Sequence, residues 1–124
     1  MPDSPETIGF IRNSFRSVWT LELLLLLRSE SRSWNFVELV DRLRASELVV
    51  RQGIASLMAG GLVLAETEES VRYAPASPDL DRLADKAAEA YARKPDAIRR
   101  LIVLSSTDKL AAFADAFRLR GDKE

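Results

Sequence analysis

Two adjacent glycines, Gly60 and Gly61, constrain the fold of this chain more than any other feature of its sequence. Glycine adopts the left-handed backbone that ends many helices, so the pair predicts a helix end followed by a change of direction. We expect this helix to begin at Ser46, whose hydroxyl can accept from free N–H groups of the first turn. Its buried side is predicted from the i, i+4, i+7 spacing of Val50, Ile54 and Leu57.

Two short runs of alternating residues follow the glycines and predict a β-hairpin over residues 62–66 and 71–74. A polar tip, Thr67-Glu68-Glu69-Ser70, joins the two runs. The alternation gives each strand one apolar side, made by Leu62 and Leu64 or by Val63 and Ala65 in the first run, and by Val71 and Tyr73 in the second. The chain is therefore expected to combine a helix with a small antiparallel hairpin.

Helices are predicted on the N-terminal side of this unit. A short amphipathic helix is indicated by Ile8, Ile11 and Phe15, and a second one spans about 17–30. The second contains the run of leucines at 23–27, which makes it apolar nearly all round and predicts burial on several sides. A third helix opens at Trp34 with a capping box and ends near residues 44–45. Its capping pair is Asn35 and Glu38, its core side is Phe36, Val37, Leu39, Val40 and Leu43, and the core aromatics are Trp19 and Trp34.

More helices are predicted after the hairpin. Ser77 and Pro78 have the N-cap and first-turn pattern of a helix that runs to about Arg93, and Pro95 begins the next one. A last helix follows residues 105–107. The predicted fold class is mainly α with a small β-hairpin.

Composition excludes several kinds of chemistry. The chain has no Cys and no His, which excludes disulfides, thiolate chemistry and the usual zinc sites. Neither a phosphate-binding loop nor a Rossmann glycine pattern is present, so we expect no enzyme activity and no cofactor. The acidic start lacks the features of a signal peptide, and no apolar run approaches the roughly 20 residues of a membrane span. A cytoplasmic protein with no membrane partner is expected.

The segment Ser46-x-x-x-Val50-x-x-x-Ile54-x-x-Leu57-x-x-x-Gly61-Leu62-Val63 resembles the recognition-helix-to-wing signature of bacterial winged helix-turn-helix regulators of the MarR, ArsR and PadR-like families. Arg72-Tyr73 lies where the second wing strand of those families often has similar residues. The resemblance extends over about residues 18–74. It implies a winged helix-turn-helix domain at 17–76, preceded by a tail and short helix at 1–16 and followed by C-terminal helices at 77–124.

The resemblance implies a sequence-specific DNA-binding transcriptional regulator with a recognition helix at about 46–60 and a wing at about 62–74. In such proteins the exposed side of the second helix of the motif enters the major groove of double-stranded DNA. Arg51 could donate to guanine and Gln52 could pair with adenine. The full set of implied DNA-binding residues is Arg42, Arg44, Ser46, Val49, Arg51, Gln52, Ser56 and Arg72.

Charge leaves an alternative function open. Residues 34–61 carry three basic and three acidic side chains, and the hairpin tip carries Glu68 and Glu69. Apolar Leu48 and Val49 lie on the presumed reading side. Because phosphate neutralisation supplies most non-specific DNA affinity, these features also fit a winged-helix module that binds a protein partner and no DNA. A small-molecule sensor with an apolar pocket between the wing domain and the terminal helices is a third reading, compatible with the first.

The terminal helices carry more apolar surface than a small winged-helix core needs. We expect this surface to form a homodimer, since a two-fold axis would place two recognition helices about one DNA turn apart. The expected dimerisation residues are Ile98, Leu101, Ile102, Leu110, Phe113 and Phe117.

Overall fold

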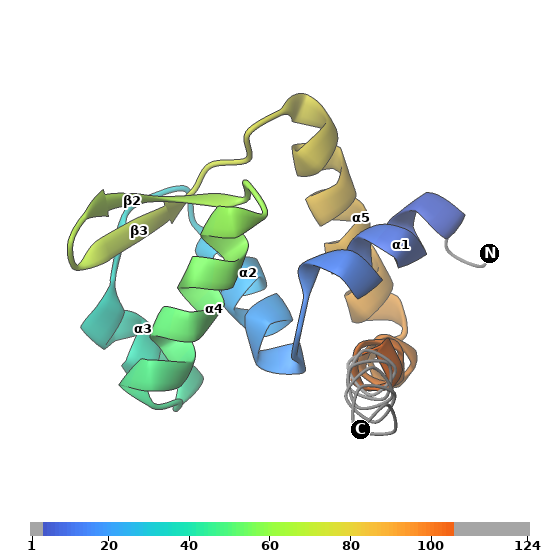
Figure 1. Ribbon diagram of the computed structural model, residues 1–124, viewed down its shortest axis with the longest axis horizontal. Helices are drawn as coiled ribbons and strands as arrows, with labels where there is room; N and C mark the ends of the chain where they lie inside the picture. The colour runs from blue at the N-terminus through green and yellow to red at the C-terminus, as the bar shows by residue number, and fades with distance from the viewer. Residues whose placement is uncertain (1–3, 106–124) are drawn as a thin grey trace, which may run out of the picture.

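The computed structural model describes residues 4–105 of the chain, most of them helical, with a small three-stranded antiparallel sheet (Figure 1). The elements are α1 (Pro5–Ser14), α2 (Val18–Ser29), β1 (Trp34–Asn35), α3 (Phe36–Leu43), α4 (Glu47–Ala59), β2 (Val63–Thr67), β3 (Ser70–Tyr73) and α5 (Pro78–Arg93). Residues 95–105 are also helical. The predicted class, mainly α with a small hairpin, is confirmed.

Side-chain caps fix the starts of several helices where the sequence predicts them. The Ser46 hydroxyl accepts from the Val49 N–H at 3.1 Å at the start of α4. The Ser77 hydroxyl does the same for α5, and Pro78 occupies its first turn. Asn35 and Glu38 form the predicted capping box of α3. Local hydrogen bonding therefore sets these boundaries.

Gly61 ends α4 in the left-handed conformation, with a φ of 75°. The next N–H, that of Leu62, donates to the Leu57 carbonyl at 3.0 Å and satisfies an acceptor at the helix end. A side chain at Gly61 would be strained whatever the space around it. The predicted role of this glycine as a helix end is confirmed.

The sheet differs from the sequence prediction in extent and in strand number. Its order is β1-β3-β2, and the two hairpin strands occupy 63–67 and 70–73 instead of 62–66 and 71–74. A bulge at Glu66 interrupts the register between Ala65 and Thr67. Trp34 was predicted to open a helix, but it instead pairs with Val71 in the two-residue strand β1. Such a short strand leaves no alternation that could predict it.

The leucine-rich helix α2 lies at the centre of the core, as its apolar circumference predicts. It packs on α4, α3 and β3, and its most buried leucines are Leu21, Leu23, Leu24 and Leu27. α1 packs on α5 on the other side of the molecule (Figure 1). The aromatic ring of Trp34 is fully buried, as expected for a core residue.

Two predicted core residues, Val37 and Trp19, are exposed, as is Leu64 on one of the two candidate apolar sides of the hairpin. The side chain of Val37 is 76% exposed because it lies on the outer side of the first turn of α3. Leu64 is 59% exposed because β2 is an edge strand of which only the first residue, Val63, is buried. Trp19 is 45% exposed, since at the start of α2 it lies beside α4 and not within the core. Placing Val37 and Trp19 in the core was wrong, and neither of the two sides offered for the first hairpin strand is buried beyond its first residue.

Candidate functional site

The helix α4 has one buried and one exposed side. Its buried side consists of Val50, Gly53, Ile54 and Leu57 and packs on α2. A Cβ atom at Gly53 would lie 2.8 Å from Cδ2 of Leu23, so the missing side chain lets the two helices approach closely. The exposed side carries Leu48, Gln52, Ala55 and Ala59. α4 therefore offers about half its circumference to a partner.

One flank of α4 faces α3 and holds the predicted guanine reader, Arg51. Its Nε donates to Oε1 of Glu47 at 2.8 Å, and its guanidinium lies 4.8 Å from the centre of the Phe36 ring. Both charged side chains are exposed, and ion pairs of this kind contribute only about 0–1 kcal/mol. Arg51 therefore has partners within the chain, and these contacts are weak enough to be replaced by contacts with a ligand.

The two other basic residues of the helix-turn-helix segment differ in their surroundings. The Arg42 guanidinium lies 5.5 Å from the centre of the buried Trp34 ring. Arg44 ends α3 with a left-handed φ of 52°, is exposed, and forms no ion pair with the residues that the structure describes. Of the two predicted phosphate contacts, Arg44 is therefore the more available.

The hairpin is short and acidic. Its basic residue, Arg72, donates to Oε1 of Glu66 at 2.8 Å, so the positive charge predicted to contact DNA is already paired. The Thr67 and Ser70 hydroxyls lie 2.7 Å apart across the tip, which carries Glu68 and Glu69. This hairpin presents no unpaired cation to a phosphate.

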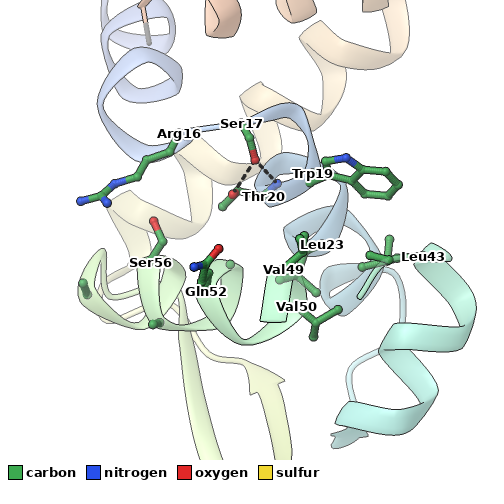
Figure 2. A pocket seen from close by; sticks show the side chains of 14 residues that line it. Arg16, Ser17, Trp19, Thr20, Leu23, Leu43, Val49, Val50, Gln52 and Ser56 are labelled. Carbon is green, nitrogen blue, oxygen red and sulfur yellow. Dashed lines mark hydrogen bonds between the residues drawn. The ribbon is translucent and has the colours of Figure 1, made fainter. Parts of the chain in front are cut away.

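The other flank of α4 forms one wall of a groove of about 720 Å³ (Figure 2). The opposite wall is residues 16–23, which end the α1–α2 connection and begin α2, and Leu43 at the end of α3 closes one end together with Ala45. Among the described residues that line it, Arg16 is the only charged one, while Trp19 and Val49 supply exposed apolar surface. Three predicted DNA-binding residues, Val49, Gln52 and Ser56, belong to this groove.

The sequence did not predict the groove. Trp19 follows the same helical spacing as the buried leucines, so nothing in the pattern marks it as exposed. The groove also lies on the α4 side of α2, not between the hairpin and the terminal helices, where a sensor pocket was expected. Its position depends on how α2 and α4 pack, which no local signal encodes.

The predicted dimerisation residues fall into two groups. Ile98 and Ile102 are buried within the single chain, and Leu101 is partly buried against the same core. Leu110, Phe113 and Phe117 lie outside the described residues. Beyond the core-facing pair, the helical segment 95–105 exposes Val103 and Leu104. In this structure Ile98 and Ile102 stabilise the monomer and leave little of their surface for a second copy.

Both tyrosines join α5 to the rest of the molecule. The Tyr73 hydroxyl donates to Asp81 at 2.7 Å, and burial together with this carboxylate raises the pKa of Tyr73 to about 12. The Tyr91 hydroxyl donates to Glu22 at 3.0 Å, and burial followed by this hydrogen bond also raises the pKa of Tyr91. Both phenols are held in the neutral form.

Residues 4–105 contain no group of three or more acidic, His or Cys side chains that could hold a metal ion. Within the same residues no helix is long and apolar enough to cross a membrane. Comparison of the chain with protein families, with curated proteins and with solved structures found no match.

Proposed function

We propose that this protein is a winged helix-turn-helix module that binds double-stranded DNA and regulates transcription, with α4 as the helix that enters the major groove. The observation that carries the proposal is the exposed side of α4 within the element order α2-β1-α3-α4-β2-β3 and the sheet order β1-β3-β2. Helix-turn-helix proteins use an exposed second helix of this kind to read base edges.

The exposed side of α4 carries side chains suited to base contacts. Gln52 lies near its middle and can form two hydrogen bonds with adenine. Arg51 can exchange the Glu47 carboxylate for guanine or a phosphate, because an exposed ion pair costs little to open. The exposed position of Arg44, at the turn between α3 and α4, supports a phosphate contact by this residue. Val49 and Ser56 extend the same surface toward the groove.

The acidic hairpin limits how such a module would bind. Its basic residue Arg72 is paired with Glu66, and its tip carries the carboxylates of Glu68 and Glu69, which repel phosphate. The affinity must then come from α4 and the adjacent turn. Since each neutralised phosphate steepens the dependence on salt, we expect a shallower salt dependence than that of a module with a basic wing.

Selection from genomic DNA tests the proposal. Purified protein is incubated with sheared genomic DNA from its source at moderate salt, and the retained DNA is sequenced. We expect a recurring motif that is lost in Arg44→Ala/Gln52→Ala and kept in Lys86→Ala, because Lys86 is an exposed cation on α5, away from the α3–α4 turn. No enrichment by folded wild-type protein would contradict DNA binding.

A second candidate function is a winged-helix module that binds a protein. It is favoured by one observation: Leu48 is 65% exposed on α4, while the neighbouring cations Arg51 and Arg72 are both paired with carboxylates. A protein contact through this leucine would be lost in Leu48→Asp and would hardly respond to salt, whereas DNA affinity falls as salt rises, though less steeply than for a module with a basic wing. The two functions are thus separable by one salt titration.

A further inference from the structure

A second, smaller pocket lies at the junction of α3, the start of α4 and the tip of the β2–β3 hairpin. Its volume is about 190 Å³, below the roughly 300–1,000 Å³ of sites that take a drug-sized molecule. A pocket of this size can receive one side chain of a partner and is too small for a cofactor. The described residues that line it are Asn35, Phe36, Val37, Val40, Glu47, Arg51 and Glu69.

Apolar side chains of α3 form one wall of this pocket. Val37 is 76% exposed in the first turn of the helix, and Val40 follows one turn later, partly buried. The buried Phe36 ring completes the wall, with its centre 4.8 Å from the Arg51 guanidinium. Such a wall gains free energy when the aliphatic stem of a long side chain covers it.

The polar side of the pocket is acidic. Glu47 and Glu69 contribute two carboxylates against the one guanidinium of Arg51, so the described lining carries a net charge of −1. Arg51 is paired with Glu47, whereas neither Glu69 nor its neighbour Glu68 forms an ion pair with the residues that the structure describes. A carboxylate beside apolar surface favours a cation on an apolar stem.

Hydrogen bonds of the backbone hold the acidic tip against the apolar wall. The Phe36 N–H donates to the Glu69 carbonyl oxygen at 2.9 Å, and the Glu69 N–H donates to the Thr67 hydroxyl at 3.2 Å. The hairpin tip is thereby tied to the first residue of α3, so both sides of the pocket are preorganised. Preorganisation lowers the free-energy cost of binding.

We propose that this pocket binds a positively charged side chain, arginine or lysine, of a protein partner. The aliphatic stem lies on Val37, Val40 and Phe36, and the cationic head group lies beside Glu69 and Glu47. Arginine is enriched among the residues that anchor protein interfaces, where it fills pockets of the partner. DNA is disfavoured as the occupant because its phosphates would approach the two carboxylates.

The pocket is separate from the surface assigned to DNA. Of the residues proposed to contact DNA, only Arg51 is among those that line it, and Leu48 is not among them either. Binding at the pocket therefore depends neither on DNA binding by α4 nor on a protein contact through Leu48.

Two ligands of the same shape test the pocket. N-acetyl-arginine methylamide is charged, whereas the corresponding citrulline compound is neutral. In two-dimensional NMR spectra of the isotope-labelled full chain, the arginine compound should shift chiefly the backbone amides of Val37, Val40 and Glu69. It should bind about fivefold more tightly than the citrulline compound, the factor expected from one partly exposed ion pair. Equal affinities, or shifts spread equally to acidic residues of α5 such as Glu89, would overturn the proposal.

Two substitutions at the hairpin tip form a matched pair. Each of Glu69→Gln and Glu68→Gln removes one negative charge from an exposed position, but only Glu69 lines the pocket. Glu69→Gln should weaken binding of the arginine compound about fivefold, and Glu68→Gln by less than about twofold. The unfolding midpoint of each variant checks that the fold is intact. Equal weakening would assign the binding to the general charge of the tip and would overturn the pocket.

A second pair tests the apolar wall. Val37→Ser removes exposed apolar surface within the pocket, and Leu48→Ser removes it outside the pocket. We expect weaker binding of the arginine compound in Val37→Ser and unchanged binding in Leu48→Ser. Unchanged binding in Val37→Ser would overturn the predicted contact with the stem.

Selection from a random peptide library identifies the chemistry of the partner. Peptides displayed on phage are selected on the wild-type protein and then depleted on Glu69→Gln. We expect the remaining sequences to share an arginine or lysine next to an apolar residue. Acidic or uncharged sequences, or sequences that Glu69→Gln retains equally well, would overturn the proposal.

A DNA duplex of random sequence tests the other class of occupant. Removing a carboxylate should leave DNA affinity unchanged or raise it, because Glu69 repels phosphate. Shifts of the pocket amides caused by the duplex, together with weaker DNA binding in Glu69→Gln, would assign the pocket to DNA and overturn the proposal. Failure of the arginine compound to bind would overturn the pocket and leave a motif selected from genomic DNA intact. A bound arginine compound without any such motif would overturn DNA binding alone.

Discussion

The two flanks of α4 differ in how much of their surface the chain itself satisfies. On the flank toward α3 and the hairpin, Arg51 is paired with Glu47, and Arg72 is paired with Glu66. On the flank toward the start of α2, Trp19 and Val49 are exposed along an apolar groove. On the first flank these charged groups are paired within the chain, whereas the second flank exposes apolar surface that the other described residues leave uncovered.

The largest expected difference between the flanks concerns the two tryptophans. Trp34→Ala should lower the free energy of unfolding by about 3–5 kcal/mol, because it leaves a cavity in the core. Trp19→Ala should cost under about 1 kcal/mol, as expected for an exposed side chain. Urea unfolding followed by circular dichroism measures both. A large loss from Trp19→Ala would mean that this ring is part of the core.

The close approach of α2 and α4 predicts the next effect. Gly53→Val should destabilise the protein by about 1–3 kcal/mol, because its Cβ alone would lie 2.8 Å from Leu23 Cδ2. Ala55→Val, on the exposed side of the same helix, is the matched control and carries the same helix-propensity cost of valine. Equal unfolding midpoints for the two variants would show that the helices have room to separate.

Removing either partner of the Arg51–Glu47 ion pair should change the DNA affinity, with opposite signs for the two residues. Arg51→Ala should weaken binding to the selected motif by about 1–3 kcal/mol if its guanidinium reaches a base. Glu47→Gln should strengthen binding by a smaller amount, since Arg51 no longer has to leave a carboxylate. Fluorescence anisotropy with labelled DNA provides both values. Unchanged affinity in Arg51→Ala would remove this residue from the reading surface.

The smallest effect concerns the phenols that connect α5 to the other elements. Since the pKa of Tyr73 is about 12 and that of Tyr91 is raised, the folded protein should show little tyrosinate absorbance at 295 nm near pH 10. A raised folded-state pKa stabilises the protein below the ordinary phenol value and loses this contribution as the pH rises toward 12. Stability should therefore fall between about pH 10 and 12. Full tyrosinate absorbance at pH 10 in folded protein would contradict the hydrogen bonds to Asp81 and Glu22.

Features encoded by neighbouring residues were predictable from the sequence. Ser46, Ser77 and the capping box each bond to backbone atoms within three residues, so their effect is visible in the order of the amino acids. The left-handed Gly61 is of the same kind. The mainly helical class and the exposed side of α4 follow from such local signals combined with periodicity.

Features that arise from packing between distant segments were not predictable. Trp19 and Val37 have the spacing of core residues, but burial depends on which neighbour each helix side meets. The partners of Arg51 and Arg72 depend on side-chain geometry that charge counting does not contain. The groove lies between α2 and α4, which approach closely at Gly53, and the sequence presents that residue only as one glycine within a helix. Tertiary arrangement supplied these parts of the site.

A single backbone hydrogen bond couples the local unfolding of the hairpin to that of α3. The Phe36 N–H, at the first residue of α3, donates to the Glu69 carbonyl oxygen at the hairpin tip at 2.9 Å. Opening the hairpin therefore frees a donor at the start of α3 and removes the strand partner of Trp34. Elements coupled in this way tend to open together as one cooperative unit. The Phe36 amide should exchange with solvent at the rate of the hairpin amides and not at that of an ordinary first-turn amide.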